Sequence, residues 1–332
     1  MSGASPDQAA GPRGGPAALC RLAVLVVAAA SLLSAHAASG TGVSASTAGR
    51  FAKSASATSV SATSASATAQ VPTVVAVGDI ACATDQRVSA TRCRHYDTAR
   101  LARAYRPSLV LALGDLQYRA ATLREFQSSY RRSWGKLKRV TRPVPGNHEY
   151  KSRGAAGYYA YFRRQRSPGY YAFDFGGWRI YALNSNCSDI DCRAQVRWLR
   201  QDMGANSRTC SAIMMHHPRY SSGEGEKPSM RRFWRVAYRY GADLALAGHD
   251  HHYERFRRMD ADHRRARDGI ESFVVGTGGK DLIPLTRTRR GSVARVDSTF
   301  GVLALRLGAG GYAFGFTTTR GRIVDAGVRS CR

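Results

Sequence analysis

Acidic residues are scarce in this sequence, which has 23 Asp and Glu against 50 Lys and Arg. The formal net charge of +27 excludes an acidic surface that would repel polyanions, and it leaves open a nucleic acid, a cell-wall polymer or an anionic membrane surface as partner. The basic residues are scattered along the chain and do not form one tract. This scatter favours a solvated basic surface, which steers anionic substrates only modestly, rather than a dedicated polyanion site.

The chain also lacks an apolar run of the about 20 residues that a membrane-spanning helix needs. Its longest run, Leu22–Leu33, is preceded by Arg13 and Arg21 and followed by Ala35-His36-Ala37. This pattern predicts a secretory signal peptide over residues 1–37, with an uncleaved anchor as the alternative, and hence a secreted protein with no membrane span in the mature chain. Residues 38–70, almost entirely Ala, Ser, Thr and Gly, predict a flexible linker before a domain over residues 71–332.

Paired C-x-x-C spacing is absent, which argues against a zinc knuckle. Six cysteines follow the predicted signal peptide, and an even number in an exported chain favours disulfides. Two close pairs predict the bridges Cys82–Cys93 and Cys187–Cys192, and elimination then joins Cys210 to Cys331.

Repeats of solenoid length are missing as well, and from Val71 onward apolar runs alternate with helical patterns. Helical spacing of apolar residues occurs over 96–106, 123–137, 194–203 and 231–240, whereas strand patterns follow one another directly over 170–184 and 272–328. The mixture predicts an α/β fold in which two packed mixed β-sheets are flanked by helices, rather than one doubly wound sheet.

Five apolar runs in this domain end at residues that commonly bind metals. The residues at these ends are Asp79, Asp115 with Tyr118, Asn147 with His148 and Glu149, His216 with His217, and His249 with His251. A single aspartate at a strand end often caps a turn or helix instead. Five such ends in one chain favour a metal site at the carboxyl edge of a sheet.

The number of candidate donors indicates two metal ions. Seven groups, Asp79, Asp115, Tyr118, Asn147, His216, His249 and His251, are too many for one ion of four to six ligands. Two ions about 3.5–4 Å apart that share a carboxylate would accommodate them, and such pairs promote displacement at phosphorus. The inferred reaction is hydrolysis of a phosphate ester.

These blocks resemble the calcineurin-like metallophosphoesterases, and among them the purple acid phosphatases. The matching segments are Asp79-Ile80-Ala81, Gly114-Asp115-Leu116-Gln117-Tyr118, Gly146-Asn147-His148-Glu149, Ile213-Met214-Met215-His216 and Gly248-His249-Asp250-His251, and the resemblance runs from about Val71 to the C-terminus. It implies a four-layer αββα sandwich over residues 71–332. Ala81 departs from the pattern, since it stands where the purple acid phosphatases usually have Gly and most other members of the family carry a liganding His. The lack of that His supports the subgroup, because Tyr118 is placed to replace the ligand. A phenolate suits Fe(III), so the resemblance implies Fe(III) paired with Fe(II), Zn or Mn.

The same resemblance divides the donors between the two ions. Asp79, Asp115, Tyr118 and His251 would hold one ion, and Asp115, Asn147, His216 and His249 the other, with Asp115 as the bridge. Water on the metals would be the nucleophile, and His148 would protonate the departing alkoxide. The alternatives are a structural turn for His148 and an aromatic core position for Tyr118.

Further residues near the motifs are expected to support the ligands or contact substrate. His217 and His252 each follow a ligand and point to the other side of an extended segment; Glu149, Tyr253 and Arg255 either act near the metals or only support the turn. Gly276-Thr277-Gly278-Gly279 indicates close backbone approach rather than a nucleotide loop, and His95 and His263 are expected at the surface.

Three functions are compatible with these features of the sequence. The first is an exported phosphatase that acts on a small phosphate monoester. The second is a phosphodiesterase or nuclease on the same scaffold, which the basic surface favours. The third is a non-enzymatic basic protein that associates with cell-wall polymer or another polyanion and keeps metals for structure; salt-sensitive binding without hydrolysis would identify it.

Overall fold

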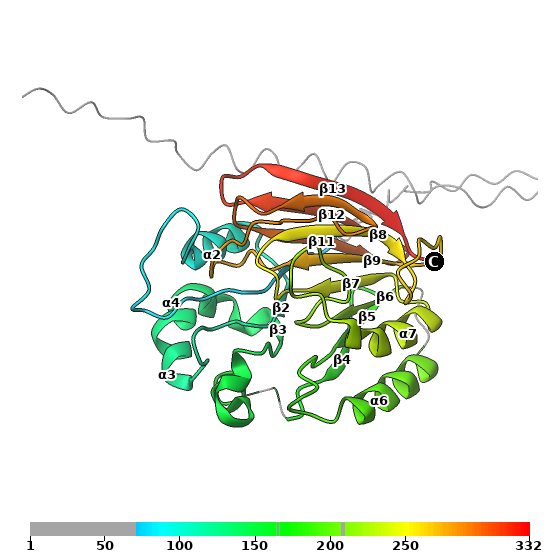
Figure 1. Ribbon diagram of the computed structural model, residues 1–332, viewed down its shortest axis with the longest axis horizontal. Helices are drawn as coiled ribbons and strands as arrows, with labels where there is room; N and C mark the ends of the chain where they lie inside the picture. The colour runs from blue at the N-terminus through cyan, green and yellow to red at the C-terminus, as the bar shows by residue number, and fades with distance from the viewer. Residues whose placement is uncertain (1–70, 164, 166, 207–209) are drawn as a thin grey trace, which may run out of the picture. The chain divides into compact units, whose positions relative to one another are not determined.

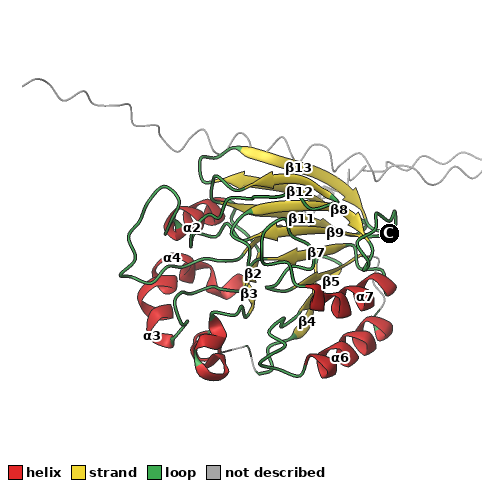
Figure 2. Cartoon of the chain, viewed as in Figure 1, coloured by secondary structure: helices red, strands yellow, loops and turns green. Residues whose placement is uncertain are grey.

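Two mixed β-sheets form the centre of the computed structural model, which describes residues 71–332 apart from 164, 166 and 207–209 (Figures 1 and 2). The six-stranded sheet has the order β13-β12-β11-β1-β2-β3 and the seven-stranded sheet the order β10-β8-β9-β7-β6-β5-β4. The first contains β1 (Thr73–Val77), β2 (Leu109–Leu113), β3 (Thr141–Val144), β11 (Gly301–Gly308), β12 (Gly311–Thr318) and β13 (Ile323–Ser330). The second contains β4 (Tyr171–Phe175), β5 (Trp178–Ala182), β6 (Cys210–Met214), β7 (Leu244–Ala247), β8 (Tyr253–Met259), β9 (Ile270–Val275) and β10 (Ser292–Val296).

Parallel strands occupy the middle of both sheets. β1, β2 and β3 are parallel to one another, with β3 at one edge of its sheet, and β5, β6, β7 and β9 are parallel in the other sheet; the remaining strands pair antiparallel. Every residue of β1, β2, β6 and β7 is buried. A strand covered on both faces needs apolar residues throughout, which explains the continuous apolar runs in the sequence. The predicted class of two mixed sheets with flanking helices is confirmed.

Helices flank the strands on two sides (Figure 2). They are α2 (His95–Ala104), α3 (Leu123–Glu125), the π-helical turn η2 (Phe126–Tyr130), α4 (Arg131–Ser133), α5 (Ala156–Tyr161), α6 (Cys192–Ala205) and α7 (Arg231–Arg239), with 3-10 turns η3 (Trp134–Val140), η4 (Glu149–Lys151), η5 (Arg153–Ala155) and η6 (Pro228–Met230). A large apolar cluster joins α2 and η2 to residues from both sheets, and a second one lies between α6, α7 and the seven-stranded sheet.

The region 123–137 is not the single helix that its spacing predicts. A capping box formed by Thr122 and Glu125 starts the first turn. The backbone N–H of Tyr130 then donates to the side-chain oxygen of Gln117 at 3.0 Å. This bond takes the N–H out of the regular helical series, and the chain passes through π and 3-10 turns before β3.

Three disulfides join the cysteines in the predicted pairs, Cys82–Cys93, Cys187–Cys192 and Cys210–Cys331. The last spans 121 residues and links the start of β6 in one sheet to the residue that follows β13 in the other. Among the described residues, no helix has the length and apolar character needed to cross a bilayer. The predicted signal peptide and linker, residues 1–70, lie outside the described residues.

Candidate metal centre

The five strand ends singled out in the sequence meet at one place. Asp79 follows β1, Asp115 follows β2 and Asn147 follows β3, all from the six-stranded sheet, while His216 follows β6 and His249 follows β7 of the seven-stranded sheet. Parallel strands end at a common edge, and the two sheets are stacked so that both edges face the same site. The seven predicted donor side chains gather there in two neighbouring groups.

Three of these donors form a first group. The Tyr118 hydroxyl lies 3.0 Å from Asp79 Oδ1 and 3.1 Å from His251 Nε2, and His251 Nε2 lies 3.3 Å from Asp79 Oδ1. Tyr118 and Asp79 are buried. Each residue therefore directs one donor atom at the same small space.

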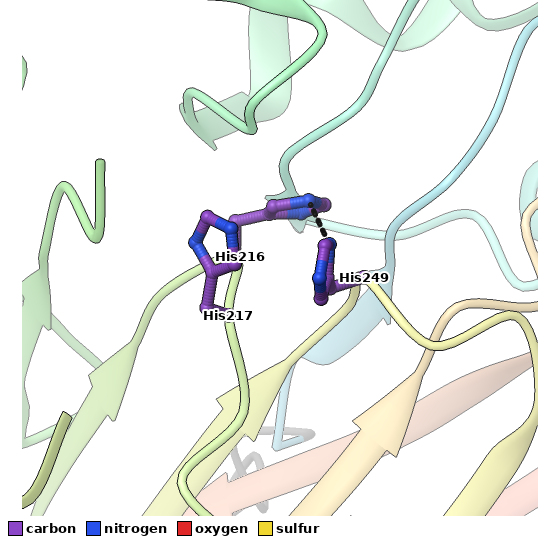
Figure 3. A group of neighbouring side chains, drawn as sticks. All are labelled: His216, His217 and His249. Atoms are coloured by element: carbon purple, nitrogen blue, oxygen red, sulfur yellow. Dashed lines mark hydrogen bonds between the residues drawn. The ribbon is translucent and has the colours of Figure 1, made fainter. Parts of the chain in front are cut away.

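A second group surrounds His216 Nε2. This atom lies 3.0 Å from Asn147 Oδ1, 3.1 Å from His249 Nδ1 and 3.4 Å from Asp115 Oδ1. Figure 3 shows His216 and His249 meeting from the ends of two neighbouring strands, with His217 beside them. Ligand atoms of Asp79, Asp115 and His216 all lie within 4.8 Å of one another, so Asp115 is placed between the two groups.

The proton positions make the second group electron-rich. His216 Nδ1 lies 2.9 Å from the carbonyl oxygen of Leu113, and because a carbonyl only accepts, Nδ1 carries the hydrogen. In the neutral ring the lone pair is then on Nε2, where it faces the oxygens of Asn147 and Asp115. Lone pairs that face one another in a buried space repel unless a cation lies between them, so the donor set fits a metal ion.

Charge balance at the first group supports the same fit. Burial alone would lower the pKa of His251, but its hydrogen bonds to Asp281 and Asp79 raise that pKa to about 10. Burial alone would raise the pKa of Asp79, and the hydrogen bond and charge of His251 instead hold it below its ordinary value. The pocket thus favours a positive charge beside Asp79, which a cation would supply equally well.

The turns that carry these donors have unusual backbone conformations. Asp79, Asp115 and His249 have positive φ angles of 59°, 48° and 73°. This left-handed region is uncommon for residues with a side chain, and it is retained where the surrounding structure determines it. The chain therefore reverses sharply at the ligand residue itself, which brings its side chain back over the strand ends.

Glu149 holds two of these turns together. Its buried carboxylate accepts hydrogen bonds from the backbone N–H groups of Gly146 and Asp115 on one oxygen and of Leu116 and Gln117 on the other. Burial and the nearby charge of Asp115 raise the pKa of Glu149 above its ordinary value, whereas these N–H groups lower it and favour the carboxylate. Of the two roles left open for Glu149, the contacts support that of a residue that fixes the turns.

Asp281 contributes to the site and was missed by the sequence analysis. Its carboxylate binds His251 Nδ1, and this contact directs Nε2 of the same ring at Asp79 and Tyr118. The Asp281 carboxylate also accepts a hydrogen bond from Lys280 Nζ at 3.1 Å. A carboxylate behind a histidine fixes the ring and increases its basicity. Asp281 lies 30 residues beyond His251 and follows a glycine-rich turn, so no short motif includes both.

His148 lies at the border of the site. Its Nδ1 contacts the carbonyl oxygen of Arg119 at 2.5 Å, and its Nε2 lies 3.9 Å from Asp115 Oδ2 and 3.1 Å from Lys151 Nζ. Burial is the main reason that the pKa of His148 lies below its ordinary value. The contact with Arg119 places the hydrogen on Nδ1 and leaves Nε2 directed toward Asp115.

The other residues expected near the metals have different surroundings. His217 lies beside the donors, with its ring 4.3 Å from that of His249 and its Nδ1 2.8 Å from Ser185 Oγ. His252 is buried and pairs with Glu254 at 3.2 Å. This carboxylate also binds Ser222, so His252 supports a neighbouring loop.

Tyr253 and Arg255 were predicted near the metals or in the turn, and the structure uses them elsewhere. Both side chains bind Asp325 of β13, at 2.6 and 2.7 Å, and Arg255 also pairs with Glu271 of β9 at 3.1 Å. Their polar atoms therefore connect β8 of one sheet with the edge strand of the other. Their nearness in sequence to His251 does not bring these polar groups to the donors, because the chain leaves the site where β8 begins.

Two smaller expectations also have an outcome. His95 was expected at the surface but is buried at the start of α2, with Nε2 3.4 Å from Ser129 Oγ. Burial lowers the pKa of this ring to about 4. The interpretation of the glycine-rich segment is supported, because a Cβ at Gly278 would lie 2.2 Å from the carbonyl oxygen of Gly78.

Comparisons with known proteins agree with this geometry. The family model of the calcineurin-like phosphoesterases matches residues 72–253. Purple acid phosphatase 23 of Arabidopsis thaliana is 29% identical over 195 residues, which is 46% of this chain and 43% of the relative, so the chain spans less than half the length of that protein. 

Two solved structures show the same fold. A purple acid phosphatase from yellow lupin (Lupinus luteus) seeds has a TM-score of 0.64 at 18% identity, covering 78% of this chain and 53% of that protein. A dimetal phosphatase from Danio rerio has a TM-score of 0.53 at 15% identity, covering 79% and 99%. The chain therefore belongs to the calcineurin-like phosphoesterase family, with distant similarity to the plant purple acid phosphatases.

Proposed function

We propose that the chain is an exported hydrolase of phosphate monoesters with two metal ions. The observation that carries the proposal is the pair of adjacent donor groups, one around Tyr118 and one around His216, with Asp115 between them. Seven oxygen and nitrogen donors at a strand edge suit two hard or borderline cations. Similarity to purple acid phosphatases supports a phosphate ester as substrate.

Each ion would be held by four residues. Asp79, Tyr118, His251 and the shared Asp115 would hold one, and Asn147, His216, His249 and Asp115 the other. The Tyr118 oxygen is the reason to propose Fe(III) for the first position, with Fe(II), Zn or Mn in the second. When bound, the two cations would neutralise the phosphate and activate water at neutral or lower pH.

The chain's own residues would orient the ligands and move one proton. Asp281 fixes the ring of His251, and Glu149 fixes the turns that carry Asp115 and Asn147. His148 Nε2 accepts a hydrogen bond from the Lys151 ammonium at 3.1 Å on the side of Asp115, so Lys151 holds the proton. We assign this proton to the leaving alkoxide, with His148 as the group that delivers it.

Export is part of the same proposal. The predicted signal peptide over residues 1–37 and the linker over 38–70 support secretion, and so do the three disulfides of residues 71–332, because such bridges persist in oxidising compartments. N-terminal sequencing of protein from the culture medium is expected to begin at residue 38. A start at residue 1 or retention in the membrane would contradict the cleavage.

The function is tested by metal analysis together with turnover of an aryl monoester and a bis-aryl diester. We expect two metals per chain, faster release of phosphate from the monoester, and a visible absorption band that Tyr118→Phe removes. Asp115→Asn should abolish turnover. Colourless active protein would contradict only the iron assignment, whereas absence of hydrolysis by metal-loaded protein would contradict the enzyme itself.

A phosphodiesterase or nuclease is the second candidate, which the net charge of +27 favours. Faster cleavage of the diester or of single-stranded nucleic acid than of the monoester would select it. The non-enzymatic alternative predicts polyanion binding that survives metal removal and falls with salt, without hydrolysis by the loaded protein.

A further inference from the structure

A cavity that none of the proposed metal donors lines lies beside β3 and β4 (Figure 1). It has a volume of about 870 Å³ and is lined by η3, β3, β4 and residues between α5 and β4. β3 and β4 are edge strands of different sheets, and the Tyr171 hydroxyl bridges them by donating to the carbonyl oxygen of Pro143 at 2.8 Å. The cavity reaches Thr141, the first residue of β3, whereas the donor Asn147 follows the last residue of that strand.

Positive charge gathers around this cavity. Among the described residues, the lining contains no carboxylate. It contains five basic side chains, those of Lys136, Lys138, Arg139, Arg142 and Arg163. Within the described part of the chain none of the five forms an ion pair, in contrast to Arg179 and Arg255. The residues are spread over 28 positions in the sequence, so the charge cluster exists only in the folded chain.

These cations affect one another. The pKa of Lys138 lies below its ordinary value because burial and the charges of Arg163 and Arg131 disfavour its protonated form. Like charges that are close together without carboxylates produce a positive potential, which a cavity with low-dielectric walls concentrates. The cavity is therefore suited to an anionic ligand.

Flat aromatic side chains supply the remaining wall. Tyr171 and Phe173 lie on the same face of β4, and their rings are stacked with centroids 5.9 Å apart and an interplanar angle of 28°. The Arg142 guanidinium lies 5.7 Å from the centre of the Phe173 ring. Phe173 is partly exposed, so a planar apolar group can pack against it.

We propose that this cavity binds a nucleotide, either free or as one unit of a single strand, with its phosphate among the basic residues and its base against Phe173 and Arg142. Ligand cavities of about 300–1,000 Å³ hold molecules of this size. Cations beside stacked aromatic rings are also the combination that binds single-stranded nucleic acid without sequence preference. Inorganic phosphate and polyphosphate would use only the charges, and a duplex would keep its bases stacked away from the ring.

The site does not depend on the metal centre, because none of its lining residues is a proposed metal donor. Binding is measured by calorimetry on the metal-loaded full chain, and any binding at the metal centre is identified as the part that the cavity variants leave unchanged. The probes are a phosphonate analogue of AMP that cannot be hydrolysed, a phosphorothioate tetrathymidylate, and polyphosphate of equal charge.

Two variants separate the charges from the aromatic wall. Phe173→Leu keeps a strand-compatible side chain but loses the flat ring, and we expect it to weaken binding of both nucleotide probes about tenfold while polyphosphate binding is unchanged. Arg142→Gln is expected to weaken binding of all three probes and to reduce the salt dependence. The matched controls are Tyr240→Leu and Arg239→Gln, exposed residues at the end of α7 outside the cavity, and they should leave binding unchanged.

The outcomes distinguish the ligand source and allow refutation. Equal affinity for both nucleotide probes indicates a free nucleotide, and tighter binding of the tetranucleotide indicates single-stranded nucleic acid; either result supports the proposal if Phe173→Leu weakens it. Equal binding of polyphosphate and nucleotide by the wild-type chain, or equal loss in the control variants, overturns it. Turnover of the aryl monoester should be unchanged in all four variants, so failure here is distinct from failure of the proposed hydrolase.

Discussion

The most specific structural prediction concerns the buried carboxylate of Glu149. Two backbone N–H groups donate to each of its oxygens: those of Gly146 and Asp115 at 2.6 and 2.9 Å, and those of Leu116 and Gln117 at 2.9 and 3.4 Å. In Glu149→Gln one oxygen becomes an amide nitrogen, so two buried N–H groups lose their acceptor and face a donor instead.

These contacts set the unfolding free energy that Glu149→Gln should lose. Each buried donor left without a partner costs about 1–3 kcal/mol, so the variant should lose about 2–6 kcal/mol of unfolding free energy. That is a large part of the about 5–15 kcal/mol that stabilises a typical domain. Each kcal/mol lowers the melting temperature by about 2–4 °C for domains of 150–250 residues, so we expect a decrease of about 4 °C or more.

Urea unfolding followed by circular dichroism measures this loss, and metal content measures the effect on the site. Glu125→Gln is the matched control, because Glu125 also accepts backbone N–H groups, from Arg119 and Thr122, but at the surface. Water can replace those bonds, so its cost should be about 0.5–1 kcal/mol. If Glu149→Gln is no more destabilised than Glu125→Gln, the assignment of Glu149 as the residue that fixes both turns is wrong.

Three further predictions concern the metal centre. Asp281→Asn should lower metal affinity about 10–100-fold, measured by competition with a chelator, because the carboxylate behind His251 is lost; unchanged affinity would remove Asp281 from the site. Gly146→Ala should abolish monoester turnover in folded protein, because the new Cβ would lie 2.1 Å from Asp115 Oδ1, whereas Gly310→Ala meets no atom within 4 Å and should retain it. Chelation should stop turnover, with recovery on metal addition, while the far-UV circular dichroism is retained; loss of the fold on chelation would show that the metals are structural.

The central strands and most of the site could be predicted from the sequence because of their burial. β1, β2, β6 and β7 are covered on both faces, so their apolar runs are unbroken and end sharply at Asp79, Asp115, His216 and His249. The carboxyl ends of parallel strands lie at one edge of a sheet. Residues at these ends can therefore be predicted to lie together, although they are far apart in the chain. The helices at 96–106, 194–203 and 231–240 were predicted to within a few residues for a similar reason, since each packs one apolar face on a sheet.

Elements that depend on distant partners could not be predicted in the same way. β8 has the sequence YERFRRM, whose charged residues hide the strand pattern. Its Arg255 is half-buried, and its partners Glu271 and Asp325 lie 16 and 70 residues further along the chain. Asp281 was missed for the same reason, and the short helix α5 was also not predicted. The scattered basic residues gave no sign of the cavity beside β3, because they gather only when η3, β3 and the segment between α5 and β4 are brought together.

The division of the proposed donors between the two sheets has a mechanical consequence. Asp79, Asp115 and Asn147 belong to the six-stranded sheet, and His216 and His249 to the seven-stranded sheet. A cation bound by donors from both sheets would resist movement of one sheet relative to the other. The Cys210–Cys331 disulfide is a second, covalent link between the two sheets. Because the metal would bind only the folded chain, its binding free energy adds to the free energy of unfolding. The melting temperature should therefore rise with the concentration of the ion.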